Sequence, residues 1–397
     1  MLLKDFLESG STKQQELKRL YQLIRKNGPI TKAELMELTK IKKTKLNRMI
    51  DELLKNNFLR EYGVGDTSIG RPPTYYDVVL DKDYIIGIHI SKMAVEVVLC
   101  NVRYEIIEEE TFAITSIHTL DFIINKITGI IRRLMKDHKI GIEHLIGIGF
   151  ATVGPIDKKK GMIIVKEPFF AQNWKNTLVV DMLQHEFPVK IMLELATETA
   201  VVAEYDAYDS VHKNVLYLIS GAWGLGCGVI INGTLLPGQN DNYEHMSINF
   251  DGKLCSCGKR GCLVAYSSFK GIIQDLKKDK STLGLNDAQV QQVSVNDLIE
   301  YFKQGDEKTK EIILNTADYL GFGLSNLINI FQAELIILSG PLIYNFDGYF
   351  NRVVESALQN LKDRENDLIF TTGKRKDRAM VVGACITLFE SYFPKTF

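Results

Sequence analysis

Three cysteines and one histidine fall within eighteen residues of a chain that holds only six cysteines. They are His245, Cys255, Cys257 and Cys262. Zinc prefers four thiolate or imidazole ligands in a tetrahedron, and a closed set of four leaves no position for water, so such a site is structural rather than catalytic. The cluster therefore predicts a structural zinc site, and it constrains the fold because one loop must bring all four side chains to a single point.

An alternative is that these are free thiols that happen to fall together, or a disulfide beside one free thiol. Free cysteines are normally scattered and cytosolic proteins rarely keep disulfides, so a metal site is favoured. The spacing between His245 and Cys255 is not that of a standard zinc finger. Gly258 and Gly261 allow a short loop to bend around an ion. The cluster thus predicts a metal without indicating what the protein does.

A chain of 397 residues is long enough for two or three domains, each with its own core. The first ten residues place Asp5 inside an apolar run and lack the long apolar core of a signal peptide. No stretch approaches the roughly 18 uninterrupted apolar residues of a membrane span. We therefore expect a cytoplasmic protein that does not enter a membrane.

Charge is distributed unevenly along the chain. Residues 1–80 contain 15 Lys and Arg against 10 Asp and Glu, whereas the remaining residues contain 33 against 39. A basic segment attached to a slightly acidic body is typical of a module that meets a polyanion. The sequence therefore predicts a nucleic-acid-binding segment at the N-terminus.

The N-terminal segment has the pattern of three helices. A helical stripe over residues 12–26 ends at Gly28-Pro29, and Thr31 with Glu34 forms a capping box that opens a helix over residues 32–39. The inner face of a third helix follows, made of Leu46, Met49, Ile50, Leu53 and Leu54. Three helices with a tight turn before the last predict a helix-turn-helix.

The outer face of the third helix supplies the predicted contacts to double-stranded DNA. These candidate DNA-binding residues are Lys42, Lys43, Thr44, Lys45, Asn47 and Arg48. Strand-like segments at 58–62 and 75–79 would form a wing, and between them Arg71, stiffened by prolines, would enter an A·T-rich minor groove. The alternative is a solvated charged helix beside an ordinary hairpin.

The rest of the chain alternates strands, glycine turns and helices. A β-type run covers 84–100, a second strand lies near 105–114, a helix covers 120–137 and a buried strand 145–150. A second set has strands at 215–219, 229–231 and 334–340. Such repeated units predict an α/β body with two related halves. We expect a DNA-binding domain over 1–80, a first lobe over 81–205 and a second lobe over 206–397.

Essentially the whole chain resembles the winged-helix repressor branch of the ROK family (repressors, open reading frames and kinases). The resemblance rests on landmarks in order: Gly70-Arg71-Pro72-Pro73, Val153-Gly154-Pro155, Trp174, the turn 221–228, Glu244-His245-Met246 and the block 255–262. The stretch 247–262 is most similar to the xylose-responsive repressors of the family. The resemblance implies an actin-like ATPase body, zinc on His245, Cys255, Cys257 and Cys262, and a homodimer or tetramer on a pseudo-palindromic A·T-rich operator.

Two departures from the family pattern predict that the body is not a kinase. The family's catalytic Asp, in an Asn-Asp pair that opens a helix, is replaced by Leu195 and Ala196, which cannot accept a proton. The family's first phosphate loop, Asp-x-Gly-Gly-Thr, corresponds to residues 89–93, which lack both glycines and the carboxylate. The second glycine turn survives, but a lone glycine turn is weak support for nucleotide binding.

Sugar recognition is also reduced. Asn242 and Val264 stand where the family has glutamates, and His245 remains. Glu198 lies close to the lost Asn-Asp pair and would substitute in part, unless it is an exposed helical carboxylate. The predicted effector-binding residues, in a cleft between the lobes, are Asn173, Glu198, Asn242 and His245. By resemblance the best candidate effector is xylose.

The favoured function is a DNA-binding transcriptional regulator, a repressor of carbohydrate-utilisation genes with a catalytically inactive body. The alternative is an active sugar kinase with an accessory DNA-binding domain. A third hypothesis is that the body answers to a regulatory protein partner rather than to a small molecule. The sequence does not identify the operator or the effector.

Overall fold

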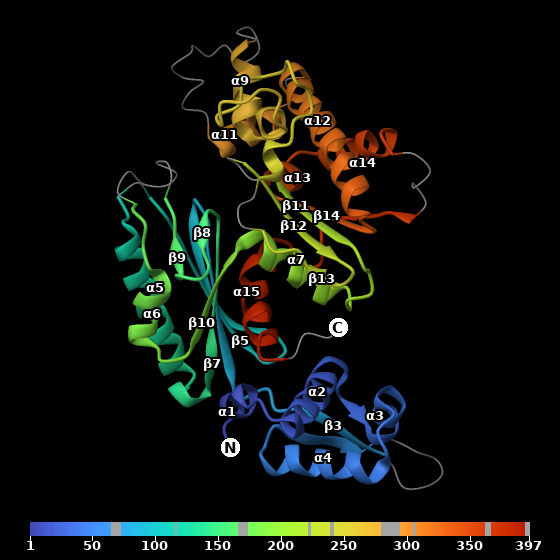
Figure 1. The fold of residues 1–397 in the computed structure, drawn as a ribbon. Helices are drawn as coiled ribbons and strands as arrows, with labels where there is room; N and C mark the ends of the chain where they lie inside the picture. The colour runs from blue at the N-terminus through green and yellow to red at the C-terminus, as the bar shows by residue number, and fades with distance from the viewer. Residues whose placement is uncertain are drawn as a thin grey trace. The chain divides into compact units, whose positions relative to one another are not determined.

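The structure is a computed structural model that describes residues 1–64, 73–115, 117–165, 174–220, 224–238, 242–278, 294–304, 307–361 and 367–393. It divides into two compact units (Figure 1). The first contains Met1–Thr152, Asp157–Glu194 and Ala384–Phe397, and the second contains Val153–Ile156 and Leu195–Gly383. The predicted lobes 81–205 and 206–397 were continuous, whereas here the main segment of the second unit begins at Leu195 and the chain returns to the first unit from Ala384.

The N-terminal part of the first unit holds four helices and a small sheet. Their bounds are α1 Leu3–Glu8, α2 Thr12–Asn27, β1 Ile30–Thr31, α3 Lys32–Thr39, α4 Lys43–Lys55, β2 Leu59–Val64 and β3 Thr74–Val78. The sheet has the order β1-β3-β2. The three predicted helices and both strands are confirmed, and α1 is an addition that the sequence reading missed.

Local sequence explains where these helices begin. The Ser11 side chain accepts the Gln14 amide at the start of α2. At the start of α3 the predicted capping box is confirmed, since Thr31 accepts the Glu34 amide and the Glu34 carboxylate accepts the Thr31 amide. Four of the five predicted inner residues of α4 are buried, and Leu54 is half-buried.

The sheet of the first unit has the order β10-β7-β4-β5-β6. Its strands are β4 Tyr84–Ile90, β5 Ala94–Asn101, β6 Ile106–Ala113, β7 Leu145–Thr152 and β10 Lys190–Leu195. Helices α5 Leu120–Asp137 and α6 Val179–Glu186 lie on one side of it, and α15 Ala379–Glu390 lies on the other (Figure 1). Short elements are η1 Ile142–His144, β8 Ile156–Asp157 and β9 Met162–Ile163.

One strand prediction needs correction. The β-type run 84–100 is two antiparallel strands, β4 and β5, rather than one. The chain turns between them because the Ser91 hydroxyl accepts the amides of Met93 and Ala94 at 3.2 and 3.0 Å and donates to the Ala94 carbonyl at 2.9 Å. Periodicity alone did not reveal the turn, since it contains neither glycine nor proline.

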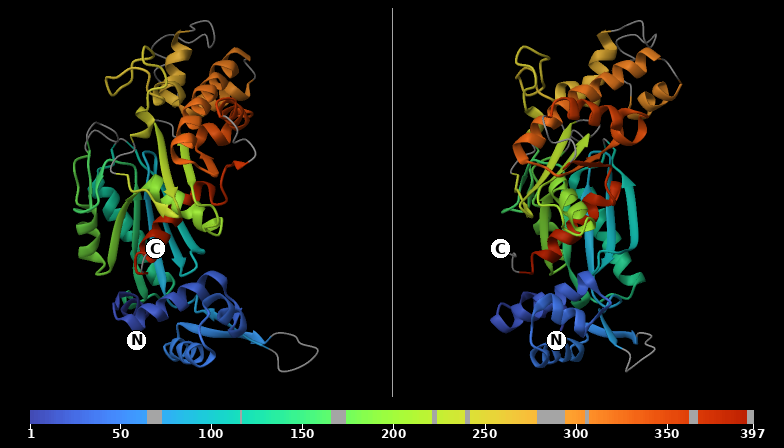
Figure 2. Two further views of the ribbon diagram at one scale, coloured as in Figure 1. Left: turned by 45° about the vertical axis from the view of Figure 1, so that its right-hand side comes forward. Right: turned by 90° about the vertical axis from the view of Figure 1, so that its right-hand side faces the viewer.

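The sheet of the second unit has the order β13-β12-β11-β14-β15. Its strands are β11 Val215–Ser220, β12 Leu225–Ile231, β13 Thr234–Leu235, β14 Leu335–Ser339 and β15 Ile369–Thr371. The helical elements are α7 Ala196–Ala207, η2 Tyr243–His245, α8 Val264–Ser267, α9 Phe269–Lys278, α11 Val295–Lys303, α12 Glu307–Phe331, α13 Pro341–Asn345, α14 Tyr349–Gln359 and η4 Lys376–Arg378. Figure 2 shows α12 and α14 side by side in both views.

The two sheets have the same topology. In each, the first strand of the sheet pairs antiparallel with the second and parallel with the fourth. The third strand lies beyond the second, and the fifth lies beyond the fourth. This shared order confirms the prediction of two related halves.

A network of charged and aromatic side chains attaches the winged helix to the sheet of the same unit. Arg25 of α2 is buried and forms an ion pair with Glu390 of α15 at 2.7 Å. Its guanidinium also lies 4.6 Å from the centre of the Tyr104 ring. Arg103, after β5, donates to the Gly28 carbonyl at 2.7 Å and pairs with Asp77 of the wing. The first eighty residues are therefore packed against the body rather than joined by a bare linker.

None of the helices that the structure describes combines the length and the apolar character needed to cross a membrane.

Candidate functional site

The candidate nucleic-acid interface is the outer face of α4. Lys42 is the residue before the helix and is exposed, as are Lys43, Thr44, Lys45 and Arg48, whereas Asn47 is half-buried. Burial of Leu46, Met49, Ile50 and Leu53 on the opposite face fixes this orientation. The six predicted residues of the helix thus lie at its N-terminal end and along one side.

The charges at this end of α4 are unfavourable for the isolated helix. Its first turn contains no acidic residue, and Lys42, Lys43 and Lys45 stand where the helix dipole is positive. A cation at that position costs roughly 0.3–1 kcal/mol at an exposed site. An anion placed against the helix would remove this repulsion, so the arrangement suits a phosphate group.

Lys45 already has a partner in the structure. Its ammonium forms an ion pair with Glu16 of α2 at 2.8 Å, and both side chains are about half exposed, at 45% and 47%. Exposed pairs of this kind contribute only about 0–1 kcal/mol. Lys45 can therefore bind a phosphate only after it gives up its ion pair with Glu16. Lys43 and Arg48 form no ion pair with another described residue, so phosphate binding by these two side chains breaks no such contact.

The wing is an antiparallel pair of strands. Leu59 pairs with Val78, and a bulge interrupts the register between Glu61 and Val64. Arg60 lies with its guanidinium 5.7 Å from the centre of the Tyr62 ring, and Tyr62 is 52% exposed. The sequence reading missed this pair, although the alternation of Arg60 and Tyr62 was a signal for it. Arg71, the predicted minor-groove residue, lies outside the described residues.

The predicted metal ligands converge. The ligand atoms of His245, Cys255, Cys257 and Cys262 all lie within 4.8 Å of one another. The Cys257 and Cys262 sulfurs are 3.6 Å apart, and His245 Nδ1 lies 3.5 Å from Cys255 Sγ. Zinc–sulfur bonds of about 2.3 Å in a tetrahedron place two sulfurs roughly 3.8 Å apart. The cluster can therefore hold a metal ion, and its donors and dimensions fit zinc.

The histidine is oriented by its own surroundings. With Nδ1 facing the cluster, His245 Nε2 lies 3.4 Å from Glu244 Oε1. The other oxygen of Glu244 accepts the Leu225 amide at 2.9 Å, which ties the carboxylate to β12. A carboxylate behind a ligating histidine fixes the ring orientation and raises its basicity. Glu244 is thus a supporting residue that the sequence reading used only as a landmark.

The surroundings of Cys257 and Cys262 shift the pKa values of their thiols in opposite directions. Burial raises the pKa of Cys262 to about 12, because the charged thiolate is poorly solvated there. A hydrogen bond from the Lys259 backbone lowers the pKa of the exposed Cys257. A metal ion supplies the positive charge that a buried thiolate lacks, and its binding displaces the thiol protons.

The predicted effector-binding residues do not all lie in similar surroundings. Asn173 lies outside the described residues. Asn242 is exposed at the start of η2, where its carbonyl accepts the His245 amide at 3.0 Å. Glu198, in the first turn of α7, is only 3% exposed and accepts the Gly238 amide at 2.6 Å. The alternative of an exposed helical carboxylate is therefore wrong for Glu198, because α7 packs against β11 and β12.

The positions that we predicted to correspond to the family's kinase residues are buried or take part in a hydrogen-bonded turn. Leu195 and Ala196 are buried at the start of α7, which begins without a side-chain cap. Ser91 and Met93 form the tight turn between β4 and β5 described above, and the Ser91 hydroxyl holds two of its amides.

Comparison with known proteins gives four findings. The sequence profile of the ROK family matches residues 85–390. A xylose repressor from Bacillus spizizenii is 30% identical over 358 residues, 88% of each chain. A crystal structure of a ROK family transcriptional regulator, a homologue of the E. coli MLC protein, has a TM-score of 0.77 at 20% identity and covers 96% of both chains. A ROK hexokinase from Thermus thermophilus has a TM-score of 0.62 at 20% identity and covers 77% of this chain and 97% of its own.

These likenesses confirm the predicted fold class, a winged helix followed by a two-lobed, actin-like body of the sugar-kinase type. The hexokinase structure accounts for most of the chain, and the regulator structure accounts for nearly all of it.

Proposed function

The chain belongs to the ROK family, and on that premise we propose that it is a sequence-specific DNA-binding transcriptional repressor of carbohydrate-utilisation genes. The observation that carries this proposal is the cationic N-terminal end of α4 on a winged helix. The recognition helix of such a domain offers its first residues to the major groove, which is where Lys43, Thr44, Asn47 and Arg48 lie. The relative at 30% identity is itself named a repressor. We expect the protein in the cytoplasm, with its DNA.

The operator proposal follows from self-association. A groove of about 710 Å³ in the second unit is lined by Phe250, Tyr319 and Phe322 among others, and Phe250 is 83% exposed. Clustered exposed aromatic side chains mark protein contacts, and we assign this one to a homodimer. A two-fold dimer requires a pseudo-palindromic operator, and Arg71 would read A·T-rich sequence within it.

The test of DNA binding uses the full-length protein. A binding site is selected from random duplexes, and its affinity is measured by fluorescence anisotropy at several salt concentrations. Lys43→Gln and Arg48→Gln should weaken binding and reduce the salt dependence, by about 0.9 in the log–log slope for each phosphate that the variant no longer neutralises. Lys55→Gln removes the same charge from the exposed C-terminal end of the same helix and should change neither.

Two outcomes would contradict the assignment of α4. One is that the wild-type protein selects no common sequence. The other is that Lys55→Gln weakens binding as much as Arg48→Gln, because the helix would then act through net charge alone.

We propose that the body does not phosphorylate sugars. Support comes from Ala196, which by resemblance stands in place of a general base, and from the turn at Ser91–Met93, where the Ser91 hydroxyl already accepts the amides of Met93 and Ala94. Loss of a positioned base typically costs about 10²–10⁴ in rate. A coupled ADP-release assay with glucose, N-acetylglucosamine, N-acetylmannosamine, xylose and fructose should show no sugar-dependent turnover. Turnover near one per second, a typical enzyme rate, would establish the kinase alternative.

We propose zinc as the resident metal of His245, Cys255, Cys257 and Cys262. It would supply only structure, because four protein ligands leave no open position. One zinc per chain by elemental analysis is the expected result. Cysteines that react freely with a thiol reagent in the native, metal-free protein would remove this proposal.

For the effector we propose a sugar, with xylose the first candidate, bound near Asn173, Glu198, Asn242 and His245. Glu198 would act by positioning the Gly238 amide, since its carboxylate is already held there. Calorimetry with xylose and glucose, repeated on Glu198→Ala and Asn242→Ala, tests this location. Micromolar binding that neither substitution changes would place the sugar elsewhere, and no binding by any sugar would favour a regulatory protein as the partner.

A further inference from the structure

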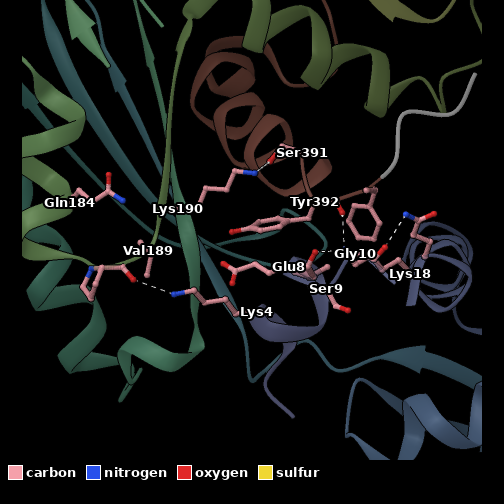
Figure 3. A pocket seen from close by; sticks show the side chains of 14 residues that line it. Lys4, Glu8, Ser9, Gly10, Lys18, Gln184, Val189, Lys190, Ser391 and Tyr392 are labelled. Carbon is pink, nitrogen blue, oxygen red and sulfur yellow. Dashed lines mark hydrogen bonds between the residues drawn. The ribbon is translucent and has the colours of Figure 1, made fainter. Parts of the chain in front are cut away.

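A cavity of about 810 Å³ lies in the first unit, and its lining includes no residue of the Cys/His cluster or of the outer face of α4. We call it the lysine pocket, lined by Lys4, Glu8, Lys18, Gln184, Lys190 and Tyr392 among others (Figure 3). Its lining comes from α1, α2 and the turn between them, from α6 and the chain that leads into β10, and from the residues that follow α15. Its volume is that of a site for a small metabolite, about 300–1,000 Å³.

Three ammonium groups line the pocket, and their hydrogen bonds go to neutral oxygens. Lys4 donates to the Pro188 carbonyl at 3.2 Å. Lys18 donates to the carbonyls of Leu7 and Tyr392. Lys190 donates to the Ser391 hydroxyl at 2.8 Å, with its ammonium 4.4 Å from the centre of the Tyr392 ring (Figure 3). No ion pair joins these three lysines to a carboxylate of any residue that the structure describes.

The positive charge of the pocket is therefore only partly compensated. Glu8 is the one carboxylate in its lining, against three ammonium groups, and it attracts Lys18 and Lys190 electrostatically without forming an ion pair with either. Lys18 is only 5% exposed, and burial lowers the pKa of both Lys18 and Lys190 because their charged forms are poorly solvated. A buried charge is costly unless it is paired, and carbonyl dipoles replace water only in part. A bound anion would supply the missing counter-charge.

We propose that the lysine pocket binds a small phosphate ester on a hydroxylated body, the chemistry of a sugar phosphate. Lysine ammonium groups bind phosphate as point charges and do not require the planar geometry of a carboxylate clamp. The remaining lining offers the amides of Gln15 and Gln184 and the hydroxyl of Ser9, which can pair with ligand hydroxyls.

A ligand in this pocket would affect how the winged helix packs against the rest of the first unit. Its lining joins α1 and α2 of the winged helix to β10 and to the end of α15 within one unit. A ligand held by Lys4 and Lys18 on one side and by Lys190 on the other would favour the packing seen here over any looser arrangement of the winged helix. Binding itself does not rest on the proposed repressor function, so the two can fail independently.

The test is calorimetry on the full-length protein without DNA, at low salt, with glucose 6-phosphate, glucose and inorganic phosphate as probes. Glucose 6-phosphate should bind, and inorganic phosphate should bind at least several-fold more weakly. Lys4→Gln and Lys190→Gln should each weaken glucose 6-phosphate about tenfold or more, because each removes a charge-assisted hydrogen bond. Glu8→Gln should tighten it, because the substitution removes the one negative charge in the lining.

Lys136→Gln is the matched control, because it removes the same charge from an exposed position of α5 in the same unit. It should leave the affinity unchanged. Thermal midpoints of all variants establish that each is folded, and Glu8→Gln, which is expected to gain affinity, separates a ligand role from a loss of structure.

Several results would overturn the proposal. Glucose binding with the same dependence on Lys4 and Lys190 would show that the phosphate is not what the pocket recognises. Equal affinity for inorganic phosphate would remove the hydroxylated body from the assignment. If no phosphate ester binds, and Lys190→Gln instead weakens the binding of a random DNA duplex, then the pocket contacts the DNA backbone.

Discussion

The two glycines of the Cys/His cluster allow a matched pair of substitutions, Gly258→Ala and Gly261→Ala. Both residues have positive φ, 85° for Gly258 and 74° for Gly261. An L residue in such a left-handed conformation costs roughly 1–2 kcal/mol, so each substitution carries about the same backbone penalty. The surroundings of the two glycines differ. A Cβ on Gly258 would meet nothing within 4 Å, whereas one on Gly261 would overlap the carbonyl oxygen of Asn249.

The overlap at Gly261 cannot be relieved cheaply. The Gly261 amide donates to the Lys253 carbonyl at 2.9 Å, and its carbonyl accepts the Ile248 amide at 2.8 Å, so its backbone is held on two sides. The next residue is the ligand Cys262. Metal–ligand distances tolerate deviations of only about 0.2 Å, and separating two overlapping atoms requires a larger shift than that. Gly261→Ala should therefore displace a ligand, and Gly258→Ala should not.

The assay is zinc content after purification, together with the rate of zinc transfer to a coloured chelator and the thermal midpoint. Gly258→Ala should keep one zinc per chain and lower the midpoint by a few degrees, since about 1 kcal/mol corresponds to about 2–4 °C in a domain of this size. Gly261→Ala should lose most of its zinc, or release it much faster. Equal behaviour of the two variants would refute the reasoning, because it would show that the close approach to Asn249 does not hold the loop.

Three further outcomes follow from other parts of the first unit. Arg25→Met should lower the free energy of unfolding by about 1.5–3 kcal/mol, since it removes the charged hydrogen bond to Glu390, and a loss below 0.5 kcal/mol in urea titration would contradict that role. Hydrogen bonds from Thr31 lower the pKa of Glu34, so its contribution to stability is present above the ordinary carboxyl pKa and is lost as the pH falls through the lowered value. The thermal midpoint of the wild type should therefore fall more steeply between pH 6 and pH 3 than that of Glu34→Gln, and parallel curves would show that the charge of the Glu34 carboxylate adds nothing, since glutamine can also close a capping box. Gly129→Ala should stabilise the protein by about 0.5–1 kcal/mol, because Gly129 is exposed in the middle of α5 with open space around its Cα, and a lower midpoint would contradict the helix argument.

Features that depend on near neighbours in the chain could be predicted from the sequence. The start of α3 follows from Thr31 and Glu34, which are three residues apart and can make both bonds of the capping box within one turn. The four candidate metal ligands converge because a short loop joins them, and the inner face of α4 follows from the spacing of its apolar residues. In each of these cases the relative positions of the residues depend on only a few backbone dihedral angles, so near neighbours in the sequence are enough to predict them.

Features that depend on distant residues were decided only by the tertiary structure. Glu198 and Gly238 meet because α7 packs against the second sheet, and that contact makes a helical carboxylate buried instead of exposed. Lys45 is less available to bind DNA because it forms an ion pair with Glu16 of another helix, α2. The lysine pocket joins Lys4 and Lys18 to Lys190 and Tyr392, which are far away along the chain and come together only when α15 returns to the first unit. Local sequence patterns do not predict contacts of this kind, because such contacts depend on the path of the whole chain and on which apolar faces pack together.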